Sequence, residues 1–482
     1  MNRSSRHNRF SSRFSTSSNS RLNAREATEA SIRFDFMRQA WPGTVATLNR
    51  ASAGSYTDSD NVLKFAANNT PRFDYLYGRN AAGNSNASYL GLLIEGPSTN
   101  LARYTEAFTV AGDGWTYNGM TGGTILGNNP ANSGSPFQFT QNNAVPGALE
   151  YAFTTGATAS IHTFSVWVQG TSTTSCDMEI VIGGSPVAIT SKIMSGHAAT
   201  VSVAGNVASI SNLVSNTSPV QNGWTRVAIT TVAALSATTT YSVRLWPRTK
   251  TSNTVGSSVA FYGAQLETTV NATSYIQNLS NVLNARVADT IVLNIAGWNR
   301  NAWNFFTPRN PVAGYTICAN LCVLQASNTA TYPRLFQLTD NGGSTTKYGI
   351  VYGNPDADGA RLRGMQWYNS FPTPRYNEPS FGYTEPGTVS GIQQYPFTTI
   401  AFSSFMDGVI GSFNVTHRDG ILRAALTEEI DPSLSLEDFR DQLMGSSSDH
   451  PIVWWRWLEY MPQGFAFNYD DMTRLSFRQY WR

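Results

Sequence analysis

Pairs of acidic side chains are the feature of this 482-residue sequence that comes nearest to a catalytic arrangement. Hydrolysis of a glycosidic bond needs two carboxyl groups at a fixed separation across that bond. Acidic residues that are neighbours in the sequence are more typical of turns and helix caps than of opposed catalytic groups. Glycan hydrolysis is therefore a minor alternative, and its candidate residues are Asp356 with Asp358, Glu428 with Glu429, and Asp470 with Asp471.

The sequence lacks the other patterns that carry catalytic chemistry. No His-Glu-X-X-His spacing would hold a metal on one helix face, and neither a supported Gly-X-Ser-X-Gly elbow nor a phosphate-binding glycine loop occurs. The loop NPDADGARLR offers Asp356, Asp358 and backbone carbonyls to calcium, but a solvated turn is the favoured interpretation. We therefore expect a non-enzymatic protein without a cofactor. The scattered histidines are His7, His162, His197, His417 and His450.

Sugar recognition would use a different set of side chains. Aromatic faces stack on sugar rings, and Asn, Asp and Arg hydrogen-bond the hydroxyl groups. The segment MQWYNSFPTPRYNEPSFGY is richest in these types, and its prolines predict a loop, where binding residues are common. Packing of the loop or a contact between subunits is the favoured alternative role. The candidate glycan-binding residues are Trp367, Tyr368, Arg375, Tyr376, Asn377 and Tyr383.

Alternating apolar residues predict the elements that position these side chains. Period-two runs separated by Gly, Asn and Thr indicate half-buried strands, and no convincing helical period interrupts them. Such strands predict two antiparallel sheets packed face to face. The expected inward residues are Phe164, Val166 and Val168 in TFSVWVQG, Val227 and Ile229 in WTRVAITT, and Tyr241, Val243 and Leu245 in YSVRLWPR, with Trp167, Arg244 and Trp246 on the opposite faces.

The stretch VAFYGAQLETTVNATSYIQ ends a well-patterned strand in polar residues. Gly263 and Ala264 add little bulk, so another backbone can cross closely. Gln265 and Glu267 can hydrogen-bond backbone groups where the sheet stops. We interpret this stretch as a seam between two domains.

The region 282–482 repeats the strand pattern with more irregular loops. Apolar runs such as YTICANLCVL and PIVWWRWLEYMP, and the Asp-Gly signal of a tight hairpin in FMDGVI, predict a second sandwich. Two short helices are expected, one over LSLEDFRDQL (434–443) and one in the tail YDDMTRLSFRQYW, capped by Asp470 or Asp471.

The charge of the chain is low and unevenly distributed. Charged residues make up 13%, and 33 basic residues nearly balance 31 acidic ones, so no overall field favours nucleic acid or a membrane. The first residues form a basic, Ser/Asn-rich arm with no pattern of a fold, which favours docking on an acidic protein surface over nucleic-acid binding. The anchoring arginines are Arg3, Arg6, Arg9, Arg13, Arg21 and Arg25.

The sequence also restricts the compartment. The first residues lack the apolar stretch of a signal peptide, and no run approaches the roughly 18 apolar residues of a membrane span. Cys176, Cys318 and Cys322 match no common zinc spacing, so we expect reduced thiols. We therefore expect synthesis in a reducing cytoplasm and no membrane insertion.

Three groups of motifs resemble those of tailed-phage virion proteins. NRASAGSYTDSDNVLKFAANNTPRFDY with GLLIEGPSTNLARYTEAF resembles an N-terminal module of such proteins, although Pro97-Ser98 replaces an Arg that often precedes Thr-Asn there. GWTRVAITT to VAFYGAQLETTVNATSYI is similar to the end of their carbohydrate-binding-like jelly roll. IVWWRWLEYMPQGFAFNYDDMTRLS is similar to the end of concanavalin-like or laminin-G-like sandwiches.

The resemblance implies a mostly β protein with a small β collar (34–105), a carbohydrate-binding-like jelly roll (106–281) and a concanavalin/laminin-G-like β-sandwich (282–482). The long basic arm (1–33) departs from the usual pattern of the family and leaves the location on the virion open. The resemblance also implies a virion structural protein, anchored to portal, capsid, neck or tail proteins, with sandwiches for adhesion to host polysaccharide as a tail or head fibre. The analogy with fibres favours a homotrimer. The alternatives are an assembly or decoration protein that binds no receptor, and a depolymerase tailspike.

Overall fold

The computed structural model is almost entirely β, with antiparallel sheets packed in layers, which confirms the predicted fold class. Among the described residues, no helix is long and apolar enough to cross a membrane. The described residues are 32–43, 46–79, 85–108, 114–124, 127–134, 136–144, 147–170, 175–193, 198–201, 207–213, 224–251, 254–293, 315–324, 334–339, 346–352, 362–368, 375–377, 380–383, 388–389, 392–393, 395–407, 411–419, 421–428, 442–444 and 452–461.

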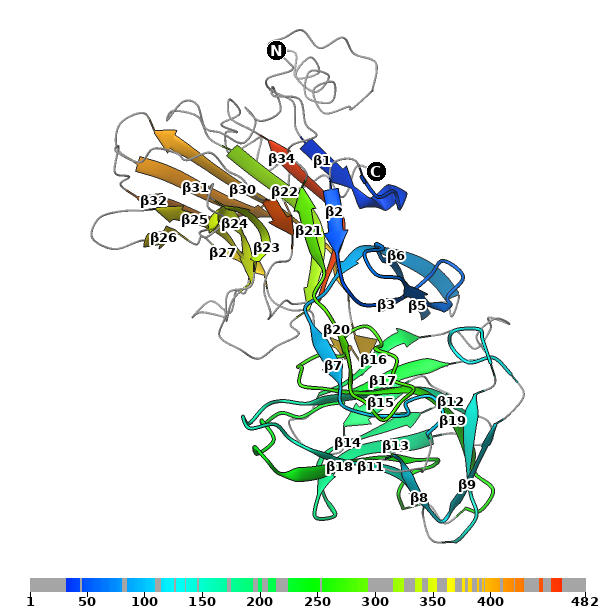
Figure 1. Ribbon diagram of the computed structural model, residues 1–482. Helices are drawn as coiled ribbons and strands as arrows, with labels where there is room; N and C mark the ends of the chain where they lie inside the picture. Colours follow the sequence, from blue (N-terminus) through cyan, green and yellow to red (C-terminus); the bar gives the residue numbers. More distant parts are fainter. Residues whose placement is uncertain are drawn as a thin grey trace.

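Two lobes lie one above the other in Figure 1. The lower lobe, drawn in cyan and green, is a sandwich of two sheets. One sheet has the order β28 (Thr388–Val389), β29 (Ile392–Gln393), β16 (Val207–Leu213), β17 (Thr225–Thr230), β12 (Thr163–Gly170), β19 (Ser258–Glu267), β10 (Phe137–Gln141) and β9 (Met120–Thr124). The other has the order β15 (Ala198–Val201), β14 (Ser185–Ile193), β13 (Ser175–Ile182), β18 (Thr240–Trp246), β11 (Ala148–Thr154) and β8 (Thr116–Asn118).

The upper lobe is a second sandwich, which includes strands from both ends of the chain. One sheet has the order β32 (Ile421–Glu428), β31 (Gly411–Arg418), β30 (Thr398–Asp407), β22 (Tyr315–Leu324), β34 (Ile452–Met461), β6 (Ser85–Ile94) and β5 (Phe73–Arg79), and β1 (Ile32–Asp35) pairs with β34. The other has the order β2 (Ala46–Asn49), β21 (Thr290–Leu293), β33 (Gln442–Met444), β23 (Arg334–Thr339), β24 (Thr346–Tyr352), β25 (Leu362–Tyr368) and β26 (Arg375–Asn377), and β27 (Ser380–Tyr383) pairs with β25.

The segment 34–105 therefore does not stand apart as a collar. Its strands β5 and β6 extend a sheet of the upper lobe, and β2 joins the opposite sheet. Within the described ranges, two small ribbons lie outside those sheets, β3 (Gly54–Thr57) with β4 (Leu63–Ala66) and β7 (Ser98–Asn100) with β20 (Asn284–Arg286). The short 3-10 helix η1 (Phe36–Arg38) is capped by Asp35, whose side chain accepts from the Met37 amide.

The inward pattern of the lower lobe is as predicted. Its core contains the expected apolar residues of β12, β17 and β18, and Trp167 packs in a separate cluster on the other side of β12. β18 alternates as expected, with buried Tyr241, Val243 and Leu245. The expectation of half-buried strands is wrong for β12, β17 and β19: β17 and β19 are buried on both faces throughout, and β12 is buried on both faces over its first six residues. Leu63, Trp224 and Tyr275 cover the outer face of this sheet.

Two local predictions in the upper lobe have opposite outcomes. FMDGVI forms the expected hairpin, in which Asp407 of β30 lies opposite Gly411 of β31. The helix expected over 434–443 is wrong at its end, because residues 442–443 belong to β33, where Leu443 pairs with Val292 of β21 and Gln337 of β23. Tertiary pairing outweighs the local helical pattern there. The expected tail helix lies outside the described residues.

Candidate functional site

A buried cluster of charges lies at the junction between the two lobes. It joins the segment around β3 to β6 with the chain that follows β19. None of its five side chains is more than 1% exposed. We call this cluster the charged junction, and its members are Arg50, Arg72, Glu95, Arg286 and Asp289.

Four ion pairs connect these residues. Arg50 Nη1 lies 2.8 Å from Asp289 Oδ1, and Arg72 Nη1 lies 2.6 Å from Glu95 Oε2. Arg286 Nη1 lies 3.1 Å from the same Glu95 oxygen, and Arg72 Nη2 donates to Asp289 Oδ2. Arg72 thus bridges both carboxylates and is the centre of the network.

Hydrogen bonds to the backbone satisfy many of the remaining polar groups of the charged junction. Arg50 Nη2 donates to the carbonyls of Ala67 and Thr70 at 2.9 Å each, and Arg286 Nη2 donates to the Gly96 carbonyl at 2.8 Å. Glu95 Oε1 accepts from the Ser274 amide at 2.8 Å. Burial of charge is costly unless such partners are present, so the network requires all of these segments to be in place together.

The stretch that we interpreted as a seam lies beside the charged junction and has the predicted contacts. Gln265 Oε1 accepts from the Ile276 amide at 2.5 Å, and Glu267 Oε2 accepts from the Thr273 amide at 3.1 Å. Gly263 has a φ of 63°, and a Cβ there would lie 3.1 Å from the Tyr275 ring. The small residue and the polar residues therefore let the chain fold back closely on β19, as the sequence predicts.

Asn100 holds the same fold-back from the other side. Its Nδ2 donates to the carbonyls of Ala264 at 3.0 Å and Ile276 at 2.9 Å. Its Oδ1 accepts from the amides of Ala102 and Leu266, each at 3.1 Å. One buried amide thus ties the start of the lower lobe to the end of β19.

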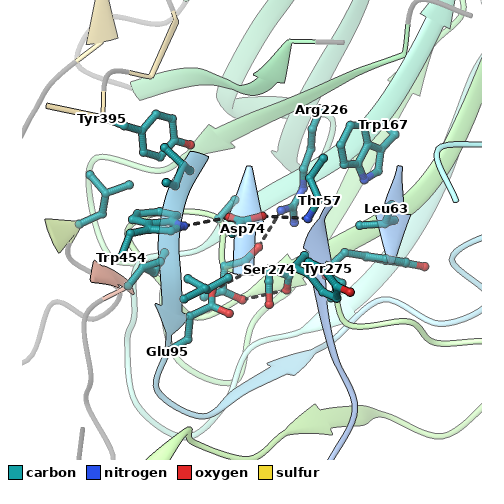
Figure 2. A pocket seen from close by; sticks show the side chains of 18 residues that line it. Thr57, Leu63, Asp74, Glu95, Trp167, Arg226, Ser274, Tyr275, Tyr395 and Trp454 are labelled. Atoms are coloured by element: carbon teal, nitrogen blue, oxygen red, sulfur yellow. Dashed lines mark hydrogen bonds between the residues drawn. The ribbon is translucent and has the colours of Figure 1, made fainter. Parts of the chain in front are cut away.

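A cavity of about 50 Å³ lies next to the charged junction. Its walls come from the strands around β3 to β6, from β12 and β17 with residues 272–275, and from the upper lobe. Figure 2 shows Asp74 between Thr57 and Trp454. Asp74 Oδ1 accepts from the Thr57 amide at 2.8 Å, and Oδ2 accepts from Trp454 Nε1 at 2.9 Å.

Burial and neighbouring charges move the pKa values of the two carboxylates on this cavity in opposite directions. Burial raises the pKa of Asp74 to about 6, although the Thr57 and Trp454 hydrogen bonds partly oppose this. Burial also acts to raise the pKa of Glu95, but Arg286 and Arg72 outweigh it and lower that pKa to about 2. Arg72 shows the matching effect, since Asp289 and Glu95 overcome its burial and raise its pKa.

A carboxylate pair with separated pKa values is also the pattern of an acid–base pair. Here, however, structural donors occupy both oxygens of Asp74 and both oxygens of Glu95. Pockets for small-molecule ligands are typically about 300–1,000 Å³, and this cavity is far smaller than a sugar ring needs. The oxygens of this pair are therefore occupied by structural hydrogen bonds and are not arranged for glycoside hydrolysis.

We predict that Asp74 contributes a pH-dependent part of the free energy of unfolding. Its pKa is higher in the folded chain, about 6 against an ordinary 3.8, so it favours folding most at low pH. This contribution is lost as the pH rises from about 4 to 6, and it amounts to about 3 kcal/mol. Urea unfolding of Asp74→Asn at a series of pH values should lack this slope. The exposed Asp60→Asn is the control and should keep it; equal slopes in all three proteins would contradict the assignment.

The candidate glycan-binding residues do not lie in a loop, so that expectation is wrong. Trp367 and Tyr368 end β25, Arg375, Tyr376 and Asn377 form β26, and Tyr383 ends β27. The three prolines of the motif interrupt none of these strands, since Pro372 and Pro374 fall between β25 and β26 in the sequence and Pro379 falls between β26 and β27. The register places Trp367 opposite Tyr376, and Tyr368 opposite Arg375. Their binding role stays a prediction.

The other candidate residues are mostly outside the described part of the chain. These are the six anchoring arginines, the possible calcium ligands Asp356 and Asp358, and the acidic residues Glu429, Asp470 and Asp471, while Glu428 ends β32. Within the described ranges, no group of three or more His, Cys, Asp or Glu side chains could hold a metal. Cys176, Cys318 and Cys322 are buried and are not joined in disulfides.

Sequence reasoning missed Arg286, Asp289 and Asp74. Arg286 and Asp289 lie three residues apart just before β21, and Asp74 lies in the apolar run of β5. Charged residues are scarce in this chain, so a charged residue inside or next to an apolar run was the available signal of a buried ionic site.

The fold and junction define a class: an all-β protein of two antiparallel sandwiches joined through buried ion pairs. No protein-family model matches the chain, and no curated protein matches it. It is similar to the solved botulinum neurotoxin type G receptor binding domain (10% identity, TM-score 0.25, 40% of each chain covered). It is also similar to the tandem CBM22-1-CBM22-2 domain of Paenibacillus barcinonensis Xyn10C (7% identity, TM-score 0.23, 76% of this chain and 98% of that one).

A third similar structure is β-agarase A from Zobellia galactanivorans (9% identity, TM-score 0.21, 37% of this chain and 67% of that one). The chain spans about two fifths of the length of the botulinum structure that it matches. At these scores the likenesses extend no further than β-sandwich architecture.

Proposed function

We propose that this protein is a non-enzymatic structural component of a tailed-phage particle. One observation carries the proposal: the motifs that resemble virion proteins converge in space on the charged junction and the seam. Arg50 comes from Arg-Ala-Ser, Arg72 from Asn-X-Pro-Arg-Phe and Glu95 from Leu-Leu-Ile-Glu. Gln265 and Glu267 come from Gly-Ala-Gln-Leu-Glu. Motifs spread over more than 200 residues thus serve one structural purpose.

A virion component benefits from this construction because its domains must keep a fixed orientation on the particle. Buried polar groups that are satisfied only in one arrangement favour that arrangement over others. The charged junction lies between the two sandwiches, so it supports a rigid two-lobed body. In the proposal, the basic arm anchors this body to another virion protein.

We further propose that the upper lobe adheres to host polysaccharide through β25, β26 and β27. The register places two aromatic residues, Trp367 and Tyr376, directly opposite one another, and pairs Arg375 with Tyr368. Aromatic and Arg side chains are suited to stacking on sugar rings and binding hydroxyl groups. In a homotrimer, three weak sites would act together through effective concentration.

A glycan-binding measurement tests the adhesive part of this proposal. Purified full-length protein is applied to an array of bacterial surface polysaccharides, and reducing ends are assayed in parallel. We expect binding without release of reducing ends. The substitutions Trp367→Ala and Tyr376→Ala should each weaken binding about 10-fold, since loss of one stacked ring costs about 1.4 kcal/mol.

The control is Phe65→Ala on β4, which removes a ring that is 37% exposed and should leave binding unchanged. Release of reducing ends would favour a depolymerase instead. The virion part is tested separately, by mass spectrometry of purified phage particles whose genome encodes the chain. Its presence in particles together with no glycan binding would favour an assembly or decoration role, and its absence from particles would overturn the virion proposal.

A further inference from the structure

Three hydrogen-bond donors on the wall of the small cavity lack acceptors in the described part of the chain. They are the Ser55 hydroxyl, Trp167 Nε1–H and Arg226 Nε–H. The three residues are 1%, 2% and 4% exposed, so bulk water does not satisfy these groups. Figure 2 shows that Arg226 and Trp167 reach the same cavity from neighbouring strands, on the side of Thr57. Buried donors without acceptors are rare, and several around one cavity indicate a missing acceptor.

Arg226 differs from the arginines of the charged junction. Its Nη1 donates to the Thr273 carbonyl at 2.7 Å and its Nη2 donates to the Ser165 hydroxyl at 3.0 Å, so both partners are uncharged. Burial lowers its pKa, and Glu267 and Glu95 oppose this effect only as neighbouring charges. A buried guanidinium with neutral partners still favours a counter-ion in contact.

We propose that this cavity is a binding site for one small monovalent anion of halide or formate size. Arg226 Nε–H, Trp167 Nε1–H and the Ser55 hydroxyl supply its hydrogen bonds, and Arg226 supplies the charge. A volume of about 50 Å³ accepts a halide or formate ion but excludes a sugar or a nucleotide. The site is independent of the proposed glycan-binding strands.

Two carboxylates on the cavity wall, Glu95 and Asp74, oppose an anion; Glu95 is paired with Arg72 and Arg286, which leaves Asp74 as the one without an ion pair among the described residues. Both of its oxygens accept hydrogen bonds, from Thr57 and Trp454, which reduces the charge that it presents to the cavity. The other titratable groups that act on Asp74 or are affected by it are Arg72, Glu95, Tyr56, Tyr89 and Tyr395. Because protonation of Asp74 removes the opposing charge, the anion should bind more tightly at pH 5 than at pH 8.

The position of the cavity gives anion binding a structural consequence. Its walls include Ser55 of β3, Trp167 and Arg226 of the lower lobe, and Trp454 of the upper lobe. Ser55 meets the two lower-lobe donors, Trp167 and Arg226, only when the ribbon of β3 and β4 is packed against the lower lobe. The anion therefore binds the folded chain in preference to the unfolded chain, and it stabilises this packing.

Thermal unfolding in different sodium salts tests the proposal. The full-length protein is titrated with sodium chloride or formate, with sodium gluconate as a bulky anion at equal ionic strength. We expect saturable stabilisation by chloride and formate only. An anion at one hundred times its dissociation constant should multiply the folding equilibrium constant about 100-fold.

Two variants link this response to the cavity. Ser55→Ala and Trp167→Phe each remove a side-chain donor that has no acceptor among the described residues, so neither substitution breaks a side-chain hydrogen bond there. Each should weaken chloride binding about 10-fold, as expected for one hydrogen bond to a charged group. The exposed Ser59→Ala is the control and should behave as the wild type.

Bromide quenching of tryptophan fluorescence gives a second, local measurement. The difference between the wild type and Trp167→Phe should contain a saturable component with the same dissociation constant as a thermal-unfolding titration with sodium bromide. Equal responses to chloride, formate and gluconate, or unchanged chloride binding in both cavity variants, would overturn the proposal and leave water as the occupant.

Discussion

Replacement of Arg72 by methionine should lower the free energy of unfolding by about 3–5 kcal/mol. The substitution leaves two carboxylates, Glu95 and Asp289, buried without their shared partner. Methionine fills much of the same volume, so lost packing contributes little. The expected consequence is separation of the lobes before either sandwich unfolds, because the network spans the junction and neither core contains it.

Chemical unfolding followed by near-ultraviolet circular dichroism measures the loss, and limited proteolysis near residues 96–105 detects opening of the junction. Arg38→Met is the matched control, because the Arg38 side chain is 78% exposed and its ion pair with Asp35 is 4.0 Å long. A surface pair of this kind contributes about 0–1 kcal/mol. Equal losses in the two variants would show that the charged junction does not stabilise the protein.

Replacement of Gly91 by alanine should cost about 4 kcal/mol, the second largest effect that we expect. Gly91 has a φ of 128°, which L-residues rarely adopt, and a Cβ there would lie 2.3 Å from the Trp455 carbonyl oxygen. Backbone strain and overpacking each cost about 1–3 kcal/mol. Trp455 cannot move away easily, because β34 is held between β22 and β6.

Gly123→Ala is the control for this prediction. Gly123 also lies in a strand, β9, but a Cβ there would meet no atom within 4 Å. Thermal unfolding of the two variants should therefore differ strongly, with little change for Gly123→Ala. Similar midpoints would mean that β6 can shift away from β34 without cost.

The same close approach explains why the N-terminal segment joins the upper lobe. The register between β5 and β6 shifts at Gly91. Asp74 pairs with Gly91, and the next residue, Tyr75, pairs with Tyr89. The edge of β6 then pairs with Val453, Trp454 and Trp455 of β34. In the sequence, β6 is an apolar run followed by Gly-Pro. Nothing in that run indicates that its partner is β34, which lies more than 350 residues away.

The seam illustrates what a local pattern can predict. Gly263, Gln265 and Glu267 contact the chain only about ten residues further on, so their roles follow from residue type and short spacing. The charged junction illustrates the limit. Arg50 and Asp289 are 239 residues apart, and the sequence around either residue does not predict that the two form an ion pair.

The amino-acid sequence by itself determined the strands of the lower lobe and their inward faces, because alternation of apolar residues directly reflects the pleat of a strand. Tertiary structure alone decided that β17 and β19 are covered on both faces, that the ends of the chain share the sheets of the upper lobe, and that four ion pairs meet at one point. The physical reason is range: side-chain alternation is a property of a few consecutive residues, whereas pairing of strand edges and of buried charges depends on which distant segments the folded chain brings together.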